Sequence, residues 1–231
     1  MATIREHIYD TREQLAEALA AGVAAVLAGG VATRGRAALA VSGGSTPALF
    51  FAHLSQAEID WSSVTIFLVD ERYVPDDTDR SNAKLVRENL MIGPASKADF
   101  VPVWRPGVTP ETAAEEVARA LDGFDDGVDA LILGMGADGH TASFFPQGNT
   151  YARVTNTNET ELVLPLDTPE QPETRVTVTM PVIQRAHFLA LHIEGNEKRT
   201  VFKDAREGNE RPISLVLRAV DELQLFWTGE S

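Results

Sequence analysis

Cysteine is absent from this chain of 231 residues, and basic side chains are scarce relative to acidic ones. Without cysteine, the chain has no disulfide framework, no thiolate zinc site and no cysteine nucleophile. Twenty basic and 34 acidic side chains give a formal net charge of -14, which argues against general binding to nucleic acid or to an anionic membrane. An anionic small molecule is still a possible ligand, because it needs only a local cluster of cations.

Long apolar runs are also missing. We find no stretch of about 18 apolar residues, so we expect no segment to span a bilayer. Arg5, Glu6 and His7 stand where a signal peptide would have its apolar region, which favours a cytoplasmic protein. We expect no metal site, because no two histidines have chelating spacing and the aspartates at 76–79 lack the glycine and distal glutamate of a calcium loop.

The hydropathy pattern alternates between short apolar runs and helical periodicity. Strands that alternate with helices predict an open, mostly parallel, Rossmann-like α/β sheet with helices on both faces. No repeat or linker divides the chain, so residues 1–231 are predicted to form one α/β domain. The predicted helices are residues 11–27 (ended by Gly29 and Gly30), 46–54, 81–90, 110–121 and 196–205. The predicted strands are residues 37–41, 64–69, 100–103, 128–133, 162–166, 176–180 and 188–193, and the apolar runs 213–217 and 223–226 close the chain.

Three of the predicted strands end in segments rich in glycine or charge, at residues 42–47, 70–72 and 134–140. Ligands of open parallel sheets bind beyond the carboxyl ends of the strands. Because the three segments follow strands in the same way, we expect them to meet at one site.

The segment at residues 42–47, SGGSTP, can hold a phosphate. Adjacent glycines let the backbone approach an anion, and the helix that follows points free N–H groups at it. A tight strand-to-helix turn capped by serine or threonine fits the pattern equally well. The segment is not a Walker P-loop, because the glycine–lysine pair is missing, and it is not the dinucleotide fingerprint.

Asp70, Glu71 and Arg72 place three charges directly after an apolar strand. Such charges are costly if they are desolvated without partners. The planar guanidinium of Arg72 can bind phosphate or carboxylate through two parallel hydrogen bonds. The alternative is a surface ion pair at the start of a loop.

The segment at residues 134–140, GMGADGH, has three glycines, an aspartate and a histidine after a fully apolar strand. His140 can take a proton near neutral pH, and Asp138 can orient its ring or favour its charged form. The alternative is a histidine that caps the next helix or is hydrogen-bonded in a turn. The other four histidines lack such a setting, and we predict that they are structural or solvated.

Two later cations complete the candidates. Arg175 begins an alternating apolar stretch, and Lys198 lies in the first turn of a predicted helix. Taken alone, each pattern is more typical of a solvated charge.

Together these segments resemble the 6-phosphogluconolactonase family. The resemblance runs in order from about residue 40 to 205, and the Asp-Gly-His segment with its flanks is its most specific part. The matching stretches are residues 43–47, 70–75 with Ser81 and Asn82, 134–146, 175–181 and 195–198.

The related glucosamine-6-phosphate isomerase/deaminases share the fold and the Asp-Gly-His core. Deaminases have a tyrosine after the Asp-Glu pair, where this chain has Arg72. They also have an asparagine-glutamate-proline ending where this chain has Phe144, Phe145 and Pro146, so their acidic partner is missing here. Both differences favour the lactonase. Gln184 stands where lactonases often have asparagine, and we assign no role to it.

The resemblance implies a carboxylic ester hydrolase that converts 6-phospho-D-glucono-1,5-lactone to 6-phosphogluconate in the oxidative pentose phosphate pathway. It implies no metal or organic cofactor, a small-molecule partner, and a monomer or small homo-oligomer. Water can attack an activated ester such as a lactone directly. We therefore hypothesise that His140 takes the proton from that water while Asp138 holds its ring. A deaminase/isomerase and a non-catalytic sugar-phosphate sensor are the alternatives.

The resemblance also implies which residues bind the substrate. The phosphate is expected to contact the glycine turn and two later cations, while Arg72 faces the phosphate or the sugar acid. The residues assigned to phosphate and substrate binding are Gly43, Gly44, Ser45, Thr46, Arg72, Arg175 and Lys198. Backbone N–H groups near the glycines or a nearby cation are the candidate donors to the oxyanion.

Overall fold

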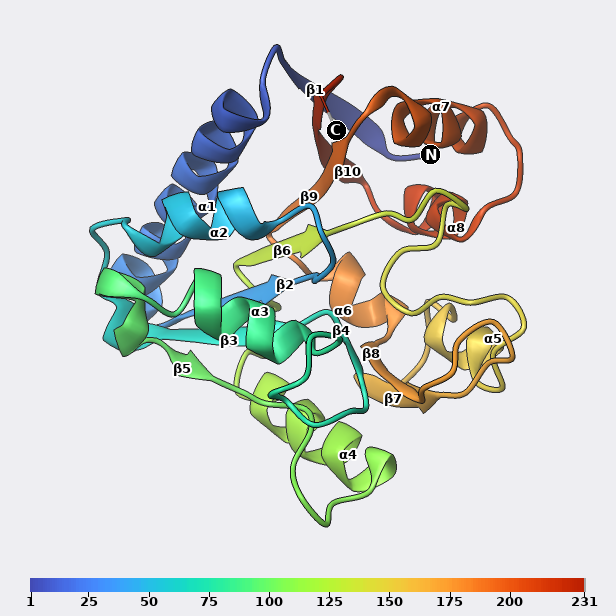
Figure 1. The fold of residues 1–231 in the computed structure, drawn as a ribbon, viewed down its shortest axis with the longest axis horizontal. Coiled ribbons are helices and arrows are strands. Elements are labelled where there is room, and N and C mark those ends of the chain that lie inside the picture. Colours follow the sequence, from blue (N-terminus) through green and yellow to red (C-terminus); the bar gives the residue numbers. More distant parts are fainter. Residues whose placement is uncertain (231) are drawn as a thin grey trace.

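A parallel sheet forms the centre of the computed structural model, which describes residues 1–230 (Figure 1). Its strands are β1 (Thr3–Tyr9), β2 (Ala37–Val41), β3 (Val64–Leu68), β5 (Asp99–Phe100), β6 (Ala130–Leu133), β9 (Phe188–Glu194) and β10 (Glu222–Thr228). Their order is β1-β10-β9-β6-β2-β3-β5, and each neighbouring pair is parallel. The mostly parallel α/β fold predicted from the sequence is confirmed.

Helices connect successive strands and flank the sheet, as parallel connections require. They are α1 (Arg12–Arg34), α2 (Ala48–Ser55), α3 (Asn82–Asn89), α4 (Pro110–Leu121), α5 (Tyr151–Val154), α6 (Met180–Gln184), α7 (Asn196–Arg206) and α8 (Pro212–Ala219). Short 3₁₀ turns lie at Trp61–Ser63 and Gly93–Lys97. α1 packs against α2 and against β2.

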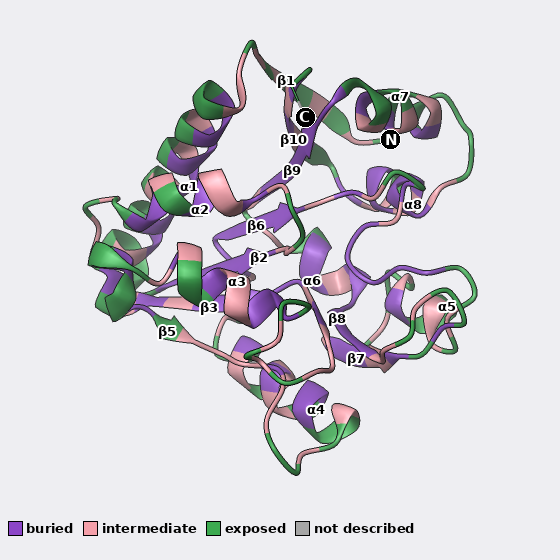
Figure 2. Cartoon of the chain, viewed as in Figure 1, coloured by how far each residue is buried: buried purple, intermediate pink, exposed green. Residues whose placement is uncertain are grey.

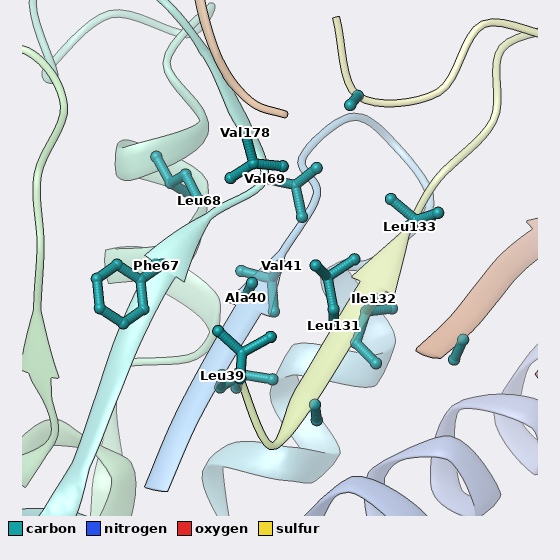
Figure 3. Close-up of a cluster of buried hydrophobic side chains, with 14 of the residues drawn as sticks. Leu39, Ala40, Val41, Phe67, Leu68, Val69, Leu131, Ile132, Leu133 and Val178 are labelled. Carbon is teal, nitrogen blue, oxygen red and sulfur yellow. The ribbon is translucent and has the colours of Figure 1, made fainter. Parts of the chain in front are cut away.

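The middle strands supply the core. β2 and β6 are buried along their whole length, as Figure 2 shows for the centre of the molecule. Phe67 and Leu131 share one face of the sheet, because both pair with Ala40 of β2, while Leu39 extends to the other face; all belong to the buried apolar core (Figure 3). Continuous apolar strands of this kind are typical of parallel sheets covered on both faces. Burial of each leucine or phenylalanine side chain contributes about 1.5–3 kcal/mol to the stability of the fold.

The strand order changes direction at β2. The chain continues from β2 to β3 and β5 on one side, and then returns to β6 on the other side of β2. At such a switch point the connections leave in opposite directions and open a crevice at the carboxyl ends of the strands. The segments that follow β2 and β6 are residues 42–47 and 134–140, so the topology brings two of the predicted segments together.

A small antiparallel sheet stands beside the central one. It consists of β4 (Asp70–Arg72), β8 (Arg175–Val178) and β7 (Val163–Leu166), in the order β4-β8-β7. The strand expected at residues 176–180 begins one residue earlier, and Met180 instead begins α6. The sequence did not predict this sheet, because three consecutive charges hide β4 and its partner strand lies about a hundred residues away.

The first helix is longer than predicted. Gly29 and Gly30 lie inside α1, which ends at Gly35 with a left-handed φ of 73°. The helix continues because its apolar face does: Leu27 and Gly30 are both buried. A Cβ on Gly30 would lie 2.2 Å from the Asp129 carboxylate, so this glycine serves a close approach and does not end the helix.

The length of α1 concerns the expectation that no segment of the chain spans a bilayer. Within residues 1–230, α1 is long and apolar enough to cross a bilayer by length and composition alone. Its Leu15, Leu19, Val23 and Leu27 are fully buried in the core. An apolar stripe packed against a sheet in this way is typical of a core helix in a globular domain.

The two ends of the chain lie side by side in the sheet. β1, which the sequence did not predict because Arg5 and Glu6 interrupt its apolar pattern, pairs with β10 along its length. Of the two closing apolar runs, residues 213–217 form part of α8 and residues 223–226 form part of β10.

Candidate active site

A cavity of about 260 Å³ lies at the carboxyl ends of β2 and β6. Segments that are far apart in the sequence supply its lining, as the switch point predicts. Every residue assigned from the sequence lines it except Asp138, which bonds to a lining side chain. The assigned lining residues are Gly43, Gly44, Ser45, Thr46, Arg72, His140, Arg175 and Lys198.

The glycine turn packs tightly against the start of α3. A Cβ on Gly43 would lie 1.9 Å from Oδ1 of Asn82, so only glycine fits there without a shift. Gly44 has a φ of 95°, a left-handed conformation that side chains disfavour. These two glycines leave the backbone of the turn open to the cavity, as binding of an anion requires.

Lys198 lies in the first turn of α7, and its side chain extends to the glycine turn at residues 42–47. Its Nζ lies 3.3 Å from Oγ1 of Thr46, a residue that is 152 positions away in sequence. Burial lowers the pKa of Lys198, while the carboxylates of Glu194 and Glu197 act in the opposite direction. The lysine is therefore a cavity residue, and the solvated-charge alternative does not describe it.

Glu71 is a buried anchor for α3. It is 1 % exposed, and its carboxylate accepts hydrogen bonds from the backbone N–H groups of Asn82 and Ala83 at 2.9 and 2.8 Å. The Ser81 hydroxyl and the Arg72 N–H donate to it as well. Burial raises the pKa of Glu71, and these donors act against that rise. A surface ion pair at the start of a loop, one reading of the sequence, is not what this residue forms.

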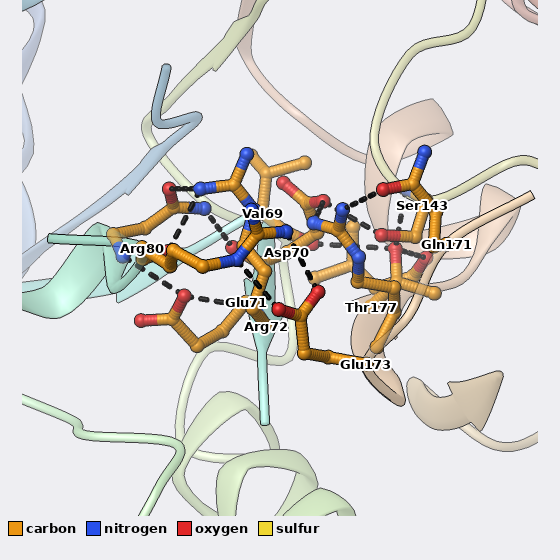
Figure 4. Close-up of polar contacts among 12 residues, drawn as sticks. Val69, Asp70, Glu71, Arg72, Arg80, Ser143, Gln171, Glu173 and Thr177 are labelled. Atoms are coloured by element: carbon orange, nitrogen blue, oxygen red, sulfur yellow. Dashed lines mark hydrogen bonds and ion pairs between the residues drawn. The ribbon is translucent and has the colours of Figure 1, made fainter. Parts of the chain in front are cut away.

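Arg72 lies next to Arg175 in the small sheet, because the two residues are register partners on the neighbouring strands β4 and β8. Nη1 of Arg72 donates to the Arg80 carbonyl at 2.7 Å. It also lies 3.5 Å from Oδ1 of Asn82, the residue that packs on the glycine turn. Figure 4 shows Arg72 beside Asp70, Glu71 and Arg80. The side chain is thus tied to the same elements as the glycine turn.

Arg175 is a buried cation within a polar network (Figure 4). It is 5 % exposed, and its Nη2 donates to Oε1 of Gln171 at 2.7 Å. The Asp70 carboxylate lies 3.9 Å from Nη1 and accepts a 2.6 Å hydrogen bond from the Ser143 hydroxyl. Burial lowers the pKa of Arg175 and the Asp70 charge opposes this. The solvated-charge alternative is excluded here too.

His140 and Asp138 form a hydrogen-bonded pair. Oδ1 of Asp138 lies 2.6 Å from Nδ1 of His140 and accepts from the His140 backbone N–H at 3.1 Å. Burial acts to raise the pKa of Asp138, but the hydrogen bonds and charge of His140 outweigh it and lower that pKa. With Nδ1 engaged, Nε2 is the ring nitrogen left to act on a substrate or water.

The glycines around this pair have a steric purpose. A Cβ on Gly136 would lie 2.3 Å from Cε1 of His140 and 2.6 Å from Asp138. Gly139 has a φ of 88°, and its N–H donates to the Gly136 carbonyl at 3.0 Å. The tight turn therefore depends on glycine where the imidazole comes closest to the backbone.

Several cavity residues were not found from the sequence. Asp70 and Asn82 line the cavity, although the sequence analysis named them without assigning them a role at the site. Gln171 lines it as well, and a polar residue in a loop gives no sign of where it points. His192, predicted to be structural or solvated, is 3 % exposed and also lines it. Burial lowers its pKa, and the Glu194 carboxylate 3.4 Å away opposes this. Within residues 1–230, no group of three or more histidines and carboxylates is placed to hold a metal ion.

The fold and the site together define a class: an α/β protein whose sheet gathers a glycine turn, three cations and a histidine–carboxylate pair around one cavity. The family model for glucosamine-6-phosphate isomerases/6-phosphogluconolactonase matches residues 10–227, and the chain belongs to this family.

Relatives and solved structures agree with this membership. A 6-phosphogluconolactonase of Rhizobium meliloti (strain 1021) is 44% identical over 225 residues, 96% of this chain and 97% of the relative. One from Mesorhizobium japonicum is 43% identical, over 98% of this chain and 96% of the relative. The crystal structure of a 6-phosphogluconolactonase from Shewanella baltica OS155 has a TM-score of 0.90 at 36% identity, covering 99% of this chain and 98% of that one.

Proposed function

We propose that this protein hydrolyses 6-phospho-D-glucono-1,5-lactone to 6-phosphogluconate in the oxidative pentose phosphate pathway. The observation that carries the proposal is the His140–Asp138 pair, 2.6 Å apart, at the cavity that also holds the glycine turn and three cations. An anion site beside a general base is the arrangement that a phosphorylated ester requires. The names of the curated relatives point to the same substrate.

The proposed chemistry needs no covalent intermediate. Nε2 of His140 takes a proton from a water molecule whose oxygen attacks the lactone carbonyl. The ring C–O bond then breaks, and the proton is returned from His140 to the departing ring oxygen. Asp138 holds the imidazole and stabilises it while it carries the extra proton. The carboxylic acid product ionises, so one proton is released for each lactone opened.

The phosphate is proposed to lie on the backbone of the glycine turn, close to Lys198. Arg72 and Arg175 are proposed to complete a positive wall. A dianionic group beside Lys198 offsets the desolvation that lowers its pKa. Because the whole molecule carries a charge of -14, this recognition is local, and long-range attraction does not guide the substrate.

The deaminase alternative lacks an acidic partner at the site. The position where deaminases carry a glutamate holds Phe145, which is buried and apolar. A non-catalytic sensor would not need His140 and Asp138 in hydrogen-bond contact. Ammonia release from glucosamine 6-phosphate tests the first alternative, and absence of any turnover favours the second.

The residues that line the proposed site include candidates for both phosphate binding and proton transfer. We propose an active monomer or small homo-oligomer in the cytoplasm, and the net charge of -14 supports the proposal that it binds neither nucleic acid nor an anionic membrane. Light scattering at the enzyme concentration of the assay measures the state that carries the activity.

Proton release on mixing protein with fresh lactone tests the function and its base. We expect His140→Ala to lower kcat by about 10²–10⁴-fold, the usual share of general acid–base catalysis. His187→Ala is the matched control, because His187 bonds the Asp126 carbonyl and is not among the cavity-lining residues. An enzyme-free sample corrects for spontaneous opening. Near-wild-type turnover in His140→Ala would refute the assignment of the base, while no turnover in the wild type would refute the function.

A further inference from the structure

The buried ring of Phe145 contacts two side chains of the proposed site. Its centroid lies 4.8 Å from that of the His140 imidazole, with 34° between the ring planes. The guanidinium carbon of Arg175 lies over the same ring, 5.7 Å from its centroid. Phe145 is 2 % exposed, so these contacts are made largely without solvent.

Three contacts surround the His140 imidazole, and the contact with Phe145 is the one made at the face of the ring. Asp138 holds one edge of the ring through Nδ1. The backbone at Gly136 closes a second side, where no Cβ could stand. Phe145 supplies a third support, at the face of the ring. An imidazole held only at one edge can tilt about that hydrogen bond, which would move Nε2 away from its target.

We propose that Phe145 is a positioning residue, which holds the His140 imidazole in its reactive orientation and links it to Arg175. The inference rests on the proposed function, since it assumes that His140 acts as the base. When His140 carries a proton, its positive charge lies against an aromatic ring, and this attraction favours the charged intermediate over the neutral ring. Phe145 therefore acts through His140 and does not touch the substrate.

The link to the binding side of the cavity runs through the backbone near Phe145. The Ser143 N–H donates to Oγ1 of Thr177 in β8, and the Ser143 hydroxyl donates to Asp70 in β4 (Figure 4). The Phe145 N–H in turn donates to the Ser143 carbonyl at 3.0 Å. The strands that carry Arg72 and Arg175 thus determine where the ring of Phe145 stands, and the ring determines where His140 stands.

The test combines kinetics with a signal that does not depend on turnover. Phe145→Leu removes the ring and keeps an apolar side chain. Phe144→Leu is the matched control, because Phe144 is equally buried and, among residues 1–230, has no aromatic contact with His140. Phe145→Tyr restores an aromatic ring and serves as the second variant if leucine impairs folding. The imidazole proton signals of His140 are assigned by their loss in His140→Ala and measured by NMR without substrate.

We expect Phe145→Leu to lower kcat about 3- to 30-fold, the range that cation–π attraction supports, with KM within about twofold of wild type. The His140 signals should move downfield, because the neighbouring ring current is lost. Phe144→Leu should leave both kcat and the His140 signals unchanged, and Phe145→Tyr should restore most of kcat.

Three results would overturn the inference. The first is an unchanged His140 signal in Phe145→Leu, which would mean that the rings are not in contact. The second is a shifted signal with wild-type kcat, and the third is an equal loss of kcat in the two leucine variants. A His140→Ala variant with full activity would instead overturn the proposed base, and the NMR contact would still be measurable. The two failures are therefore distinguishable.

Discussion

Individual glycines at this site are explained by what a single methyl group would meet. At Gly43 it would meet the Asn82 amide, and at Gly136 it would meet the His140 ring. Sequence reasoning found both glycines but assigned them to the approach of a ligand. The structure shows that they also admit neighbouring side chains of the same protein. Their steric demand therefore exists before any substrate binds.

Gly43→Ala should raise KM, because the Asn82 side chain must move and displace the turn proposed to bind the phosphate. We expect a loss of about 1–3 kcal/mol in unfolding free energy, as for other over-packed sites. Gly29→Ala is the control: it lies inside α1 with nothing within 4 Å of the new methyl, and should be neutral or stabilising by up to about 1 kcal/mol. Urea denaturation and initial rates measure the two effects, and an unchanged KM in Gly43→Ala would contradict the expectation.

Secondary-structure elements differ in how far the sequence predicts them. β2 and α4 were predicted with the observed bounds, because a continuous apolar run and a Pro-initiated amphipathic segment each contain their own signal. The end of α1 was predicted wrongly, since two glycines were interpreted without the packing that keeps the helix going. β4 was missed because its stability comes from pairing with a distant strand. The sequence therefore predicts what local periodicity encodes, and misses what long-range pairing decides.

The site follows the same division. The sequence placed His140, Asp138 and the glycine turn at strand ends, and the parallel fold accounts for their meeting. It could not show that Gln171 bonds Arg175, or that His192 lies at the cavity, because these depend on loop geometry and on burial. The catalytic roles of His140 and Asp138, and the binding role of the glycine turn, stay predictions.

The anchor of α3 yields a prediction about an element. Glu71→Gln leaves one amide oxygen where two carboxylate oxygens accepted, and it turns an NH₂ group toward other donors. We expect a loss of about 2–4 kcal/mol in unfolding free energy, because buried donors lose a charged acceptor. Glu88→Gln, on the exposed side of the same helix, should stay within about 0.5 kcal/mol. Equal stabilities of the two variants in urea would argue against the anchoring role.

The whole molecule carries a large negative charge around a locally positive cavity. Twenty basic side chains are enough for this, because three of them line one cavity. Acidification brings net charge closer to zero, which eases repulsion across the surface. The buried His192 opposes that gain, since a proton on it must be carried in a desolvated site.

The pH dependence of stability should reveal His192. Burial lowers its folded-state pKa below the unfolded value of about 6.5. The positive charges of Lys198 and Arg12 lower this pKa further, while the Glu194 carboxylate acts to raise it. Its contribution is fully present above the unfolded pKa and is lost as pH falls below it, by at most about 1.4 kcal/mol per pH unit. His192→Leu should therefore lose less stability between about pH 7 and 5 than wild type. Thermal unfolding across this pH range measures the effect, and parallel profiles of wild type and His192→Leu would refute the expectation.

The pairing of β4 with β8 also sets the sign of the charge that the cavity presents. Neighbouring residues of a strand point to opposite faces, so a slip of β4 by one position would turn Arg72 away from the cavity face and bring Glu71 onto it. A cation at the proposed phosphate wall would be replaced by an anion. The slip would break the hydrogen bonds that hold the Glu71 carboxylate at the start of α3, so these bonds favour the observed register. A residue that never faces the substrate thus keeps the site attractive to an anion, and a protein designer who copied only the cavity lining would lose that safeguard.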